Sequence, residues 1–199
     1  GFATFREFSL KYDKLTNKLI EYTMNEDKGG LINIHKLSYK DTDRVIEEVR
    51  SSGKRLSAKL TYDNVIYLDK MGRLSKTVFD GDEIWEEFQY DDRNNLKEYL
   101  VHTINGKIDR SIKLEADSHY SIFAGVSDLP LWFWSLHLNN MKWCIDFIGN
   151  NNTSSKIVED ASLLNSNEFE ITYDYDKDGY PIKQYYDGDL VKEFSYKEI

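Results

Sequence analysis

The sequence predicts an all-β protein, an antiparallel meander of about ten strands curled into a soluble barrel or half-barrel, with one short helical insert. Two observations predict this class. Apolar residues recur at every second position along most of the chain, and turn dipeptides that contain glycine separate these runs. A flat sheet of this length would leave one apolar face bare, so the sheet must curl or be covered. We expect one domain over residues 1–199.

The alternation is typical of strands with one buried and one wet face. It is clearest in LINIHKLSY (31–39), LSAKLTY (56–62), IWEEFQY (84–90) and IDRSIKL (108–114). The dipeptides between such runs supply the positive φ that tight hairpins need; they are Gly29-Gly30, Ser52-Gly53, Asp80-Gly81, Asn105-Gly106 and Asp187-Gly188. The chain therefore divides into repeat hairpins (5–116), an apolar insert (117–150), and a loop with closing hairpins (151–199).

A second regularity lies over the first. A tyrosine, an Asp-containing turn and an apolar residue follow one another from Tyr12, Tyr39, Tyr67, Tyr90 and Tyr175. This pattern predicts a degenerate repeat of one hairpin per unit, in which the tyrosine closes a strand and the Asp-rich turn reverses the chain. Chance recurrence in a chain rich in tyrosine and aspartate is the alternative.

The segment FEITYDYDKDGYPIKQYYDGDLVKEFSY (169–196) resembles the tyrosine-aspartate repeats of bacterial surface and toxin-shell proteins. The chain as a whole resembles secreted or lipid-anchored Bacteroidetes proteins of unknown function, including a family described as having a porin-like fold. The resemblance covers 5–115 and 169–196, and departs in the units that begin at Tyr39 and Tyr90, which lack the glycine. It implies a cell-envelope protein, periplasmic or attached to the outer membrane, with room for a lipoprotein anchor upstream of Gly1. It supplies no catalytic residues.

The stretch LPLWFWSLHL (129–138) concentrates aromatic surface inside the insert. Ser127 or Asp128 fits the cap of a short helix with Pro130 in its first turn. The following MKWCIDFIG (141–149) also fits a strand, and the Asn/Thr/Ser cluster after it fits a loop. We expect one or two short helices followed by a strand. The insert should close the core, with these side chains mostly buried: Leu131, Trp132, Phe133 and Leu136.

Aromatic side chains outside a core bind sugars and apolar ligands by stacking. The candidate ligand-binding residues are Trp132, Trp134, Trp85 and Tyr185. A metal candidate is the run Asp174, Asp176, Asp178, which matches the start of a calcium loop, although the twelfth position is Tyr185 where the loop needs a glutamate. A plain turn explains the same residues. We expect no cofactor, with calcium as the alternative.

Composition narrows the function. A net charge of −9 repels nucleic acid and anionic lipid surfaces, and no apolar run reaches the ~20 residues of a spanning helix. The lone Cys144 is expected to pack as a small apolar residue. We expect a non-enzymatic cell-envelope binding or structural protein whose ligand is a glycan, lipid or peptide. The alternative is a carbohydrate-active enzyme that uses paired carboxylates, drawn from Glu86, Glu87, Asp91, Asp92 and Glu98.

Overall fold

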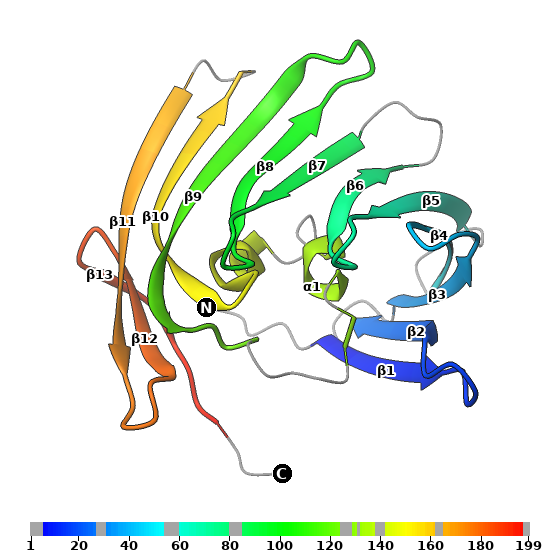
Figure 1. The fold of residues 1–199 in the computed structure, drawn as a ribbon, viewed down its shortest axis with the longest axis horizontal. Coiled ribbons are helices and arrows are strands. Elements are labelled where there is room, and N and C mark those ends of the chain that lie inside the picture. Colours follow the sequence, from blue (N-terminus) through cyan, green and yellow to red (C-terminus); the bar gives the residue numbers. More distant parts are fainter. Residues whose placement is uncertain are drawn as a thin grey trace. The chain divides into compact units, whose positions relative to one another are not determined.

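The computed structural model describes residues 6–26, 31–53, 60–79, 85–123, 129–130, 132–137, 142–161 and 165–196. It contains one sheet of thirteen strands, whose order in the sheet is their order in the chain (Figure 1). Every pairing that the structure describes between these strands is antiparallel. The predicted all-β meander is therefore confirmed, with thirteen strands in place of about ten.

The chain folds into two compact units, Gly1–Glu83 (unit 1) and Ile84–Ile199 (unit 2). Unit 1 contains β1 (Arg6–Tyr12), β2 (Leu19–Glu26), β3 (Leu31–Tyr39), β4 (Arg44–Gly53), β5 (Leu60–Leu68) and β6 (Leu74–Val78). Unit 2 contains β7 (Trp85–Tyr90), β8 (Leu96–His102), β9 (Ile108–Tyr120), α1 (Phe133–Leu136), the 3₁₀ helix η1 (Lys142–Phe147), β10 (Asn151–Asp160), β11 (Asn165–Tyr175), β12 (Pro181–Tyr186) and β13 (Asp189–Glu193). The single domain over 1–199 stays a prediction.

In unit 1 the predicted alternation decides which face is buried. Asn33, His35 and Leu37 of β3 are buried in turn, and the register places Val45 opposite Ile66 on the same face of β4 and β5. The buried apolar side chains of this unit are Leu19, Tyr22, Met24, Leu37, Val45, Val49, Ile66 and Leu74. Polar groups share this face, so the unit has a mixed interior.

In unit 2, β8, β9, β10 and β11 run side by side as a curved sheet (Figure 1). We call the face that contacts η1 the inner face; it includes Tyr99 and Leu114, and Lys156 reaches η1 from it. The outer face, opposite, includes Leu100 and Lys113, because neighbouring residues in a strand point to opposite sides. The inner face packs against η1, whose buried apolar side chains are Cys144, Ile145 and Phe147, and α1, with Trp132, Phe133 and Leu136 buried, in turn contacts η1.

Three hairpins close through the same five-residue turn with an aspartate in first place, at 69–73, 91–95 and 176–180; the turn at 103–107 makes the same backbone hydrogen bonds but begins with Thr103. In each turn the first residue donates its N–H to the fifth carbonyl and accepts at its own carbonyl from the fourth N–H. In the three aspartate turns the carboxylate of the first residue accepts from the N–H groups of the third and fifth residues. These three Asp-containing segments therefore reverse the chain because the carboxylate satisfies the turn's own backbone donors.

The fourth residue of each turn has a positive φ, as this hairpin type requires. Gly72 and Gly179 supply it in two of the turns, with φ of 77° and 86°. In the remaining turn Asn94 supplies it, with φ of 69°. Asparagine enters the left-handed region at small cost. This explains how the sequence repeat that begins at Tyr90 reverses the chain without a glycine.

The insert forms two short helices, α1 and η1, as expected, but the strand expected after them is not found there, and the next strand in the chain is β10. The strand alternative for 141–149 is wrong, because η1 is a 3₁₀ helix over Lys142–Phe147. Apart from Asn150, the Asn/Thr/Ser cluster is not a loop either, because residues 151–155 lie in β10. Asn151 begins β10 and is held by paired hydrogen bonds to the Asn95 amide, which satisfies side chains that would otherwise favour a turn.

The N-cap of α1 is Trp132, not Ser127 or Asp128, which lie outside the described residues. Trp132, Phe133 and Leu136 are buried as predicted, whereas Leu131 also lies outside the described residues. Neither helix in the described parts of the chain is long and apolar enough to span a bilayer.

Gly149 fixes the end of the insert against the turn between β7 and β8. Its φ is 124°, and a Cβ at this position would lie 2.5 Å from the carbonyl oxygen of Asn94 and from the Cα of Asn95. We expect Gly149→Ala to lower the free energy of unfolding by about 2–5 kcal/mol, because strain and overpacking add. Gly179→Ala is the control: its φ is also positive but its Cβ meets nothing within 4 Å, so the loss should be about 1–2 kcal/mol. Equal losses in urea unfolding would contradict the close packing.

Candidate functional site

The four aromatic candidates do not come together in one site. Trp132 is only 2% exposed, and Trp134 stacks on Phe123 with ring centroids 4.2 Å apart, so the two do not form an exposed pair. Trp85 of β7 stacks on the His102 ring at 4.9 Å. Tyr185 of β12 donates its hydroxyl to Asp174 at 2.7 Å. Each of these rings has a partner within the fold, and the aromatic ligand site stays a prediction.

The three aspartates of the metal candidate take different local roles. Asp176 is the first residue of the turn 176–180, and its carboxylate accepts from the backbone N–H groups of that turn. Asp174 accepts from the Tyr185 hydroxyl, and Asp178 lies 4.0 Å from the Lys177 ammonium. The residues that the structure describes contain no group of three or more His, Cys, Asp or Glu side chains able to hold a metal ion. Calcium binding here stays a prediction.

Two of the carboxylates considered for catalysis lie on opposite faces of the sheet. Glu86 is buried on the inner face, where it accepts a hydrogen bond from the Tyr99 hydroxyl. Glu98 pairs in register with Lys113 on the outer face. Because a glycosidase needs both carboxyl groups beside the same bond, Glu86 and Glu98 cannot serve as such a pair.

Unit 1 contains a buried carboxylate with several donors, which we call the Glu47 cluster (Tyr22, His35, Glu47, Asn64). One carboxylate oxygen of Glu47 accepts from the Tyr22 hydroxyl and from His35 Nδ1 at 2.9 Å. The other accepts from Asn64 Nδ2 at 2.7 Å. The His35 ring also stacks on Tyr22, with centroids 4.2 Å apart. The cluster therefore ties β2, β3 and β5 to β4 through one side chain.

The electrostatics of this cluster favour an ionised Glu47. Burial opposes the charge, but the hydrogen bonds and the charge of His35, with those of Tyr22 and Asn64, outweigh it and lower the pKa of Glu47. Burial and the Glu47 charge raise the pKa of Tyr22 well above its ordinary value. Glu47 thus acts as an acceptor for fixed donors, which is a structural role.

Unit 2 contains a second buried carboxylate, in what we call the Asp146 cluster (Asp146, Lys156, Gln184, Tyr186, Lys192). Asp146 of η1 accepts from Lys156 Nζ at 3.0 Å and from Gln184 Nε2 at 2.9 Å. The Tyr186 hydroxyl also donates to it. Lys192 Nζ lies 3.9 Å from the same carboxylate and donates to Gln184 Oε1 at 2.8 Å. The cluster joins η1 to β10, β12 and β13.

Two groups of this cluster have shifted ionisation. Burial, and then the Asp146 charge, raises the pKa of Tyr186 well above its ordinary value. Burial lowers the pKa of Lys192; the Asp146 carboxylate opposes this shift without cancelling it, and the Lys156 charge adds to it. One carboxylate therefore faces two lysines, of which Lys192 holds its proton less firmly than an ordinary lysine does.

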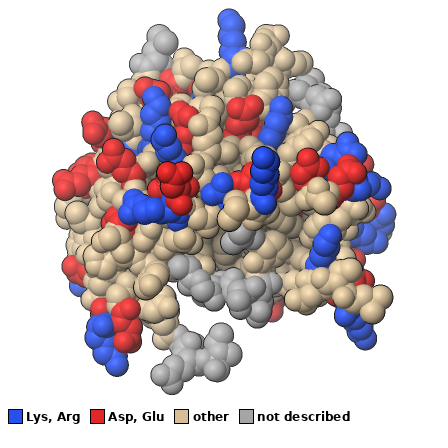
Figure 2. All heavy atoms as spheres, in the orientation of Figure 1, with Lys and Arg blue, Asp and Glu red and all other residues tan. Residues whose placement is uncertain are grey.

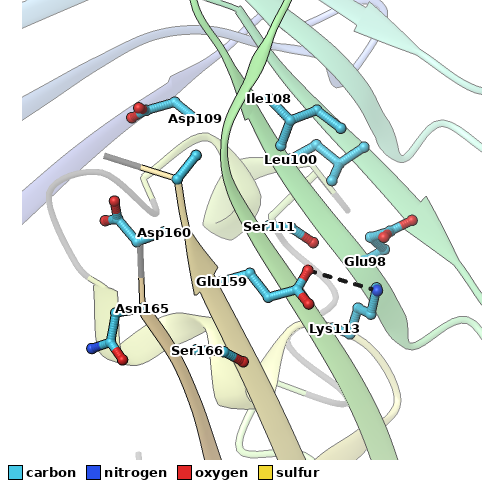
Figure 3. Close-up of a pocket in the computed structure, with 11 residues that line it drawn as sticks. Glu98, Leu100, Ile108, Asp109, Ser111, Lys113, Glu159, Asp160, Asn165 and Ser166 are labelled. Atoms are coloured by element: carbon cyan, nitrogen blue, oxygen red, sulfur yellow. Dashed lines mark ion pairs between the residues drawn. The ribbon is translucent and has the colours of Figure 1, made fainter. Parts of the chain in front are cut away.

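A groove of about 770 Å³ opens on unit 2, lined by residues of β8 to β11 (Figure 3). Its floor includes Leu100 and Ser111, which face each other in register on the outer face. They are only 8% and 7% exposed, respectively, although no element of the described insert covers this side. The floor is therefore sunk between longer side chains from neighbouring strands. These flanking residues form the rim of the groove.

The rim is acidic. Among the described lining residues, the carboxylates belong to Glu98, Asp109, Glu159 and Asp160, and the one ammonium group belongs to Lys113 (Figure 3). Lys113 Nζ lies 3.8 Å from Glu159, and Asp160 is engaged by Arg110 at 3.3 Å. After these pairings Glu98 and Asp109 still add negative charge.

The acidic character extends over the outer face around the groove. The pairing register places further carboxylates on this face, namely Glu87, Glu115, Glu168 and Glu170. On the side of the molecule seen in Figure 2, Lys and Arg side chains are interspersed with Asp and Glu and form no continuous basic patch. A ligand for this groove must therefore tolerate or neutralise negative charge.

Sequence reasoning singled out Glu98 but missed the other groove residues. By sequence pattern, Glu159 and Lys113 are charged residues on the solvent-exposed face of a strand. Nothing in their spacing distinguishes them from other such residues. The only signal was Leu100, an apolar residue on the same side of the strand LKEYLVH (96–102) as the charged Glu98 and the polar His102. An apolar side chain at a wet-face position is an indication of a local hollow or contact.

The sequence matches no family model and no curated protein. Among solved structures, the chain is similar to a porin-like protein from Bacteroides vulgatus ATCC 8482, with 13% identity, a TM-score of 0.43, and 96% of this chain and 92% of the other covered. It is also similar to a porin-like protein from Bacteroides uniformis ATCC 8492, with 10% identity, a TM-score of 0.34, and coverage of 94% and 91%.

Proposed function

We propose that the protein is a non-enzymatic binding protein of the cell envelope, and that the outer-face groove of unit 2 takes a short basic peptide in an extended conformation. The observation that carries this proposal is the combination of a sunken neutral floor with a rim in which carboxylates outnumber ammonium groups. Apolar or neutral side chains of the peptide would contact Leu100 and Ser111. Lysine or arginine side chains would reach the carboxylates of the rim.

The chemistry of the lining favours a peptide over a glycan. Sugar sites use aromatic faces for stacking, and the lining residues that the structure describes include no aromatic side chain. A lipid tail needs a continuous apolar wall, whereas the rim carries the carboxylates of Glu98, Asp109, Glu159 and Asp160. An amphipathic cation matches both parts of the groove at once.

The test uses the natural protein and a fluorescent blocked peptide of alternating lysine and leucine. We expect binding that weakens as salt is added, because exposed charges are screened over about 10 Å at 0.1 M salt. The double variant Glu98→Gln/Glu159→Gln should weaken binding about tenfold, since each exposed ion pair contributes about 0.2–1 kcal/mol. The peptide contains no tryptophan, so the protein's own tryptophan fluorescence shows whether each variant is folded.

The matched control is Asp189→Asn/Glu193→Gln, which removes the same charge from the exposed strand β13 and should leave binding unchanged. The proposal is wrong if the double groove variant binds like the natural protein, or if a peptide of alternating glutamate and leucine binds equally well. The envelope location is tested separately, by fractionating cells that produce the natural protein and probing the envelope fraction for it.

A further inference from the structure

We propose that Lys192, at the edge of the Asp146 cluster, is a nucleophilic amine that forms an imine with small aldehydes. This site is independent of the proposed groove, because it lies on the insert side of the sheet of unit 2. Three observations carry it: the count of charges around one carboxylate, the geometry of the Lys192 amine, and its partial exposure.

The charge count leaves one ammonium without a full partner. Asp146 is completely buried, and its nearest cation is Lys156, whose Nζ lies 3.0 Å away and whose side chain is itself largely buried. Lys192 Nζ is farther, at 3.9 Å, beyond hydrogen-bond distance. One carboxylate cannot neutralise two ammonium groups in a desolvated cluster, so the more distant amine has the greater tendency to lose its proton.

The geometry suits a neutral amine. Lys192 Nζ lies 2.8 Å from Gln184 Oε1, a contact that one N–H of an uncharged amine can also make, leaving its lone pair available. The other titratable groups that face it are Asp146 and Cys144 from η1, Lys156 from β10 and Tyr186 from β12. The lowered pKa of Lys192 agrees with this placement.

Access distinguishes Lys192 from its neighbours. Its side chain is 27% exposed, whereas that of Lys156 is 11% exposed and Cys144 is fully buried. A small aldehyde can therefore reach the Lys192 amine while the rest of the cluster stays covered. The Nζ lone pair attacks the carbonyl carbon and a C–N bond forms. The resulting carbinolamine loses its hydroxyl group together with a proton as water, which leaves the imine. The step needs no oxidant or reductant.

The experiment compares labelling rates of individual lysines in the natural protein. Formaldehyde is supplied in limiting amount with cyanoborohydride, which reduces the imine and fixes the label, and the sites are read by peptide mass spectrometry. Lys177 is the internal control, because it is exposed in a turn, with 89% of its side chain accessible. Lys192→Arg identifies the labelled peptide.

We expect the ratio of the Lys192 rate to the Lys177 rate to be at least threefold larger at about pH 7 than at about pH 10, where an ordinary lysine also begins to lose its proton. Accessibility cancels in this comparison because it does not change the ratio with pH. In Lys156→Gln, whose fold is checked by circular dichroism, the ratio at neutral pH should fall. A ratio that does not change with pH in the natural protein overturns the proposal without any variant.

Discussion

Replacing Glu47 by alanine is expected to lower the free energy of unfolding of unit 1 by about 3–5 kcal/mol. The substitution leaves the Tyr22 hydroxyl, His35 Nδ1 and Asn64 Nδ2 without the acceptor that each now uses inside the fold. Buried donors that lose their partner keep the full cost of leaving water. Urea unfolding followed by far-UV circular dichroism measures the loss, because all four tryptophans lie in unit 2 and report on that unit.

The control for this variant is the next residue in the same strand. Glu48 is paired with Arg50 on the other side of β4, and its side chain is 36% exposed. Glu48→Ala removes the same side-chain type from the same strand, so the change in strand propensity is matched. We expect it to cost no more than about 1 kcal/mol, as for exposed ion pairs. Similar losses in the two variants would show that the Glu47 cluster does not stabilise unit 1.

The Glu47 carboxylate is also expected to cause part of the loss of folding stability in acid. The pKa of Glu47 in the folded chain is below the ordinary 4.5, so the unfolded chain binds the proton more tightly. The stability that this group contributes is fully present above about pH 4.5 and is lost as the pH falls through the lower, folded value. Glu47→Gln should therefore remove part of the pH dependence of the unfolding midpoint in acid, whereas Glu48→Gln should leave it. Parallel curves for the natural protein and Glu47→Gln would contradict this.

Replacing Asp146 by alanine is expected to lower the free energy of unfolding of unit 2 by about 3–5 kcal/mol. The ammonium groups of Lys156 and Lys192 then share a desolvated site with no carboxylate. Tryptophan fluorescence in urea is the measurement, because Trp132 and Trp134 lie in the insert that Asp146 fastens to the sheet. Asp178→Ala is the control, since Asp178 lies in an exposed turn and should cost less than about 1 kcal/mol.

A rescue experiment separates charge from packing in this cluster. When a whole buried ion network is replaced by apolar side chains of similar size, stability is often kept. The triple variant Asp146→Leu/Lys156→Met/Lys192→Met should therefore recover most of the stability that Asp146→Ala loses. If the triple variant is as unstable as Asp146→Ala, the loss comes from packing around η1 and not from uncompensated charge.

Much of the fold was predictable because its determinants are local. Alternation such as that around Phe88 specifies which face of a strand is buried, and an aspartate that opens a turn satisfies the turn's N–H groups over a span of five residues. The errors arose where local preference and distant partners disagreed. Asn151 belongs to a loop by composition, yet its pairing with Asn95, far away in the sequence, holds it in β10.

The candidate sites were harder to predict for the same reason. Glu47 meets Tyr22 and Asn64, which are 25 and 17 residues away in the chain, only because the registers of β2 to β5 bring these positions to one level of the sheet. Trp132 and Trp85 look alike as aromatic residues, but one is in the core and the other stacks on His102. Aromatic content indicates burial or binding; only the fold distinguishes them.

The sequence by itself determined the all-β class, the antiparallel order of the hairpins and the chemistry of their turns, because period-two patterning and left-handed turn positions act over a few residues. The tertiary structure alone decided that the Asp146 carboxylate of η1 faces two lysines, Lys156 and Lys192. It also decided that Leu100 lies at the bottom of an acidic groove. These arrangements depend on register between distant strands and on the path of the insert. Neither is encoded in the spacing of residues along any single strand.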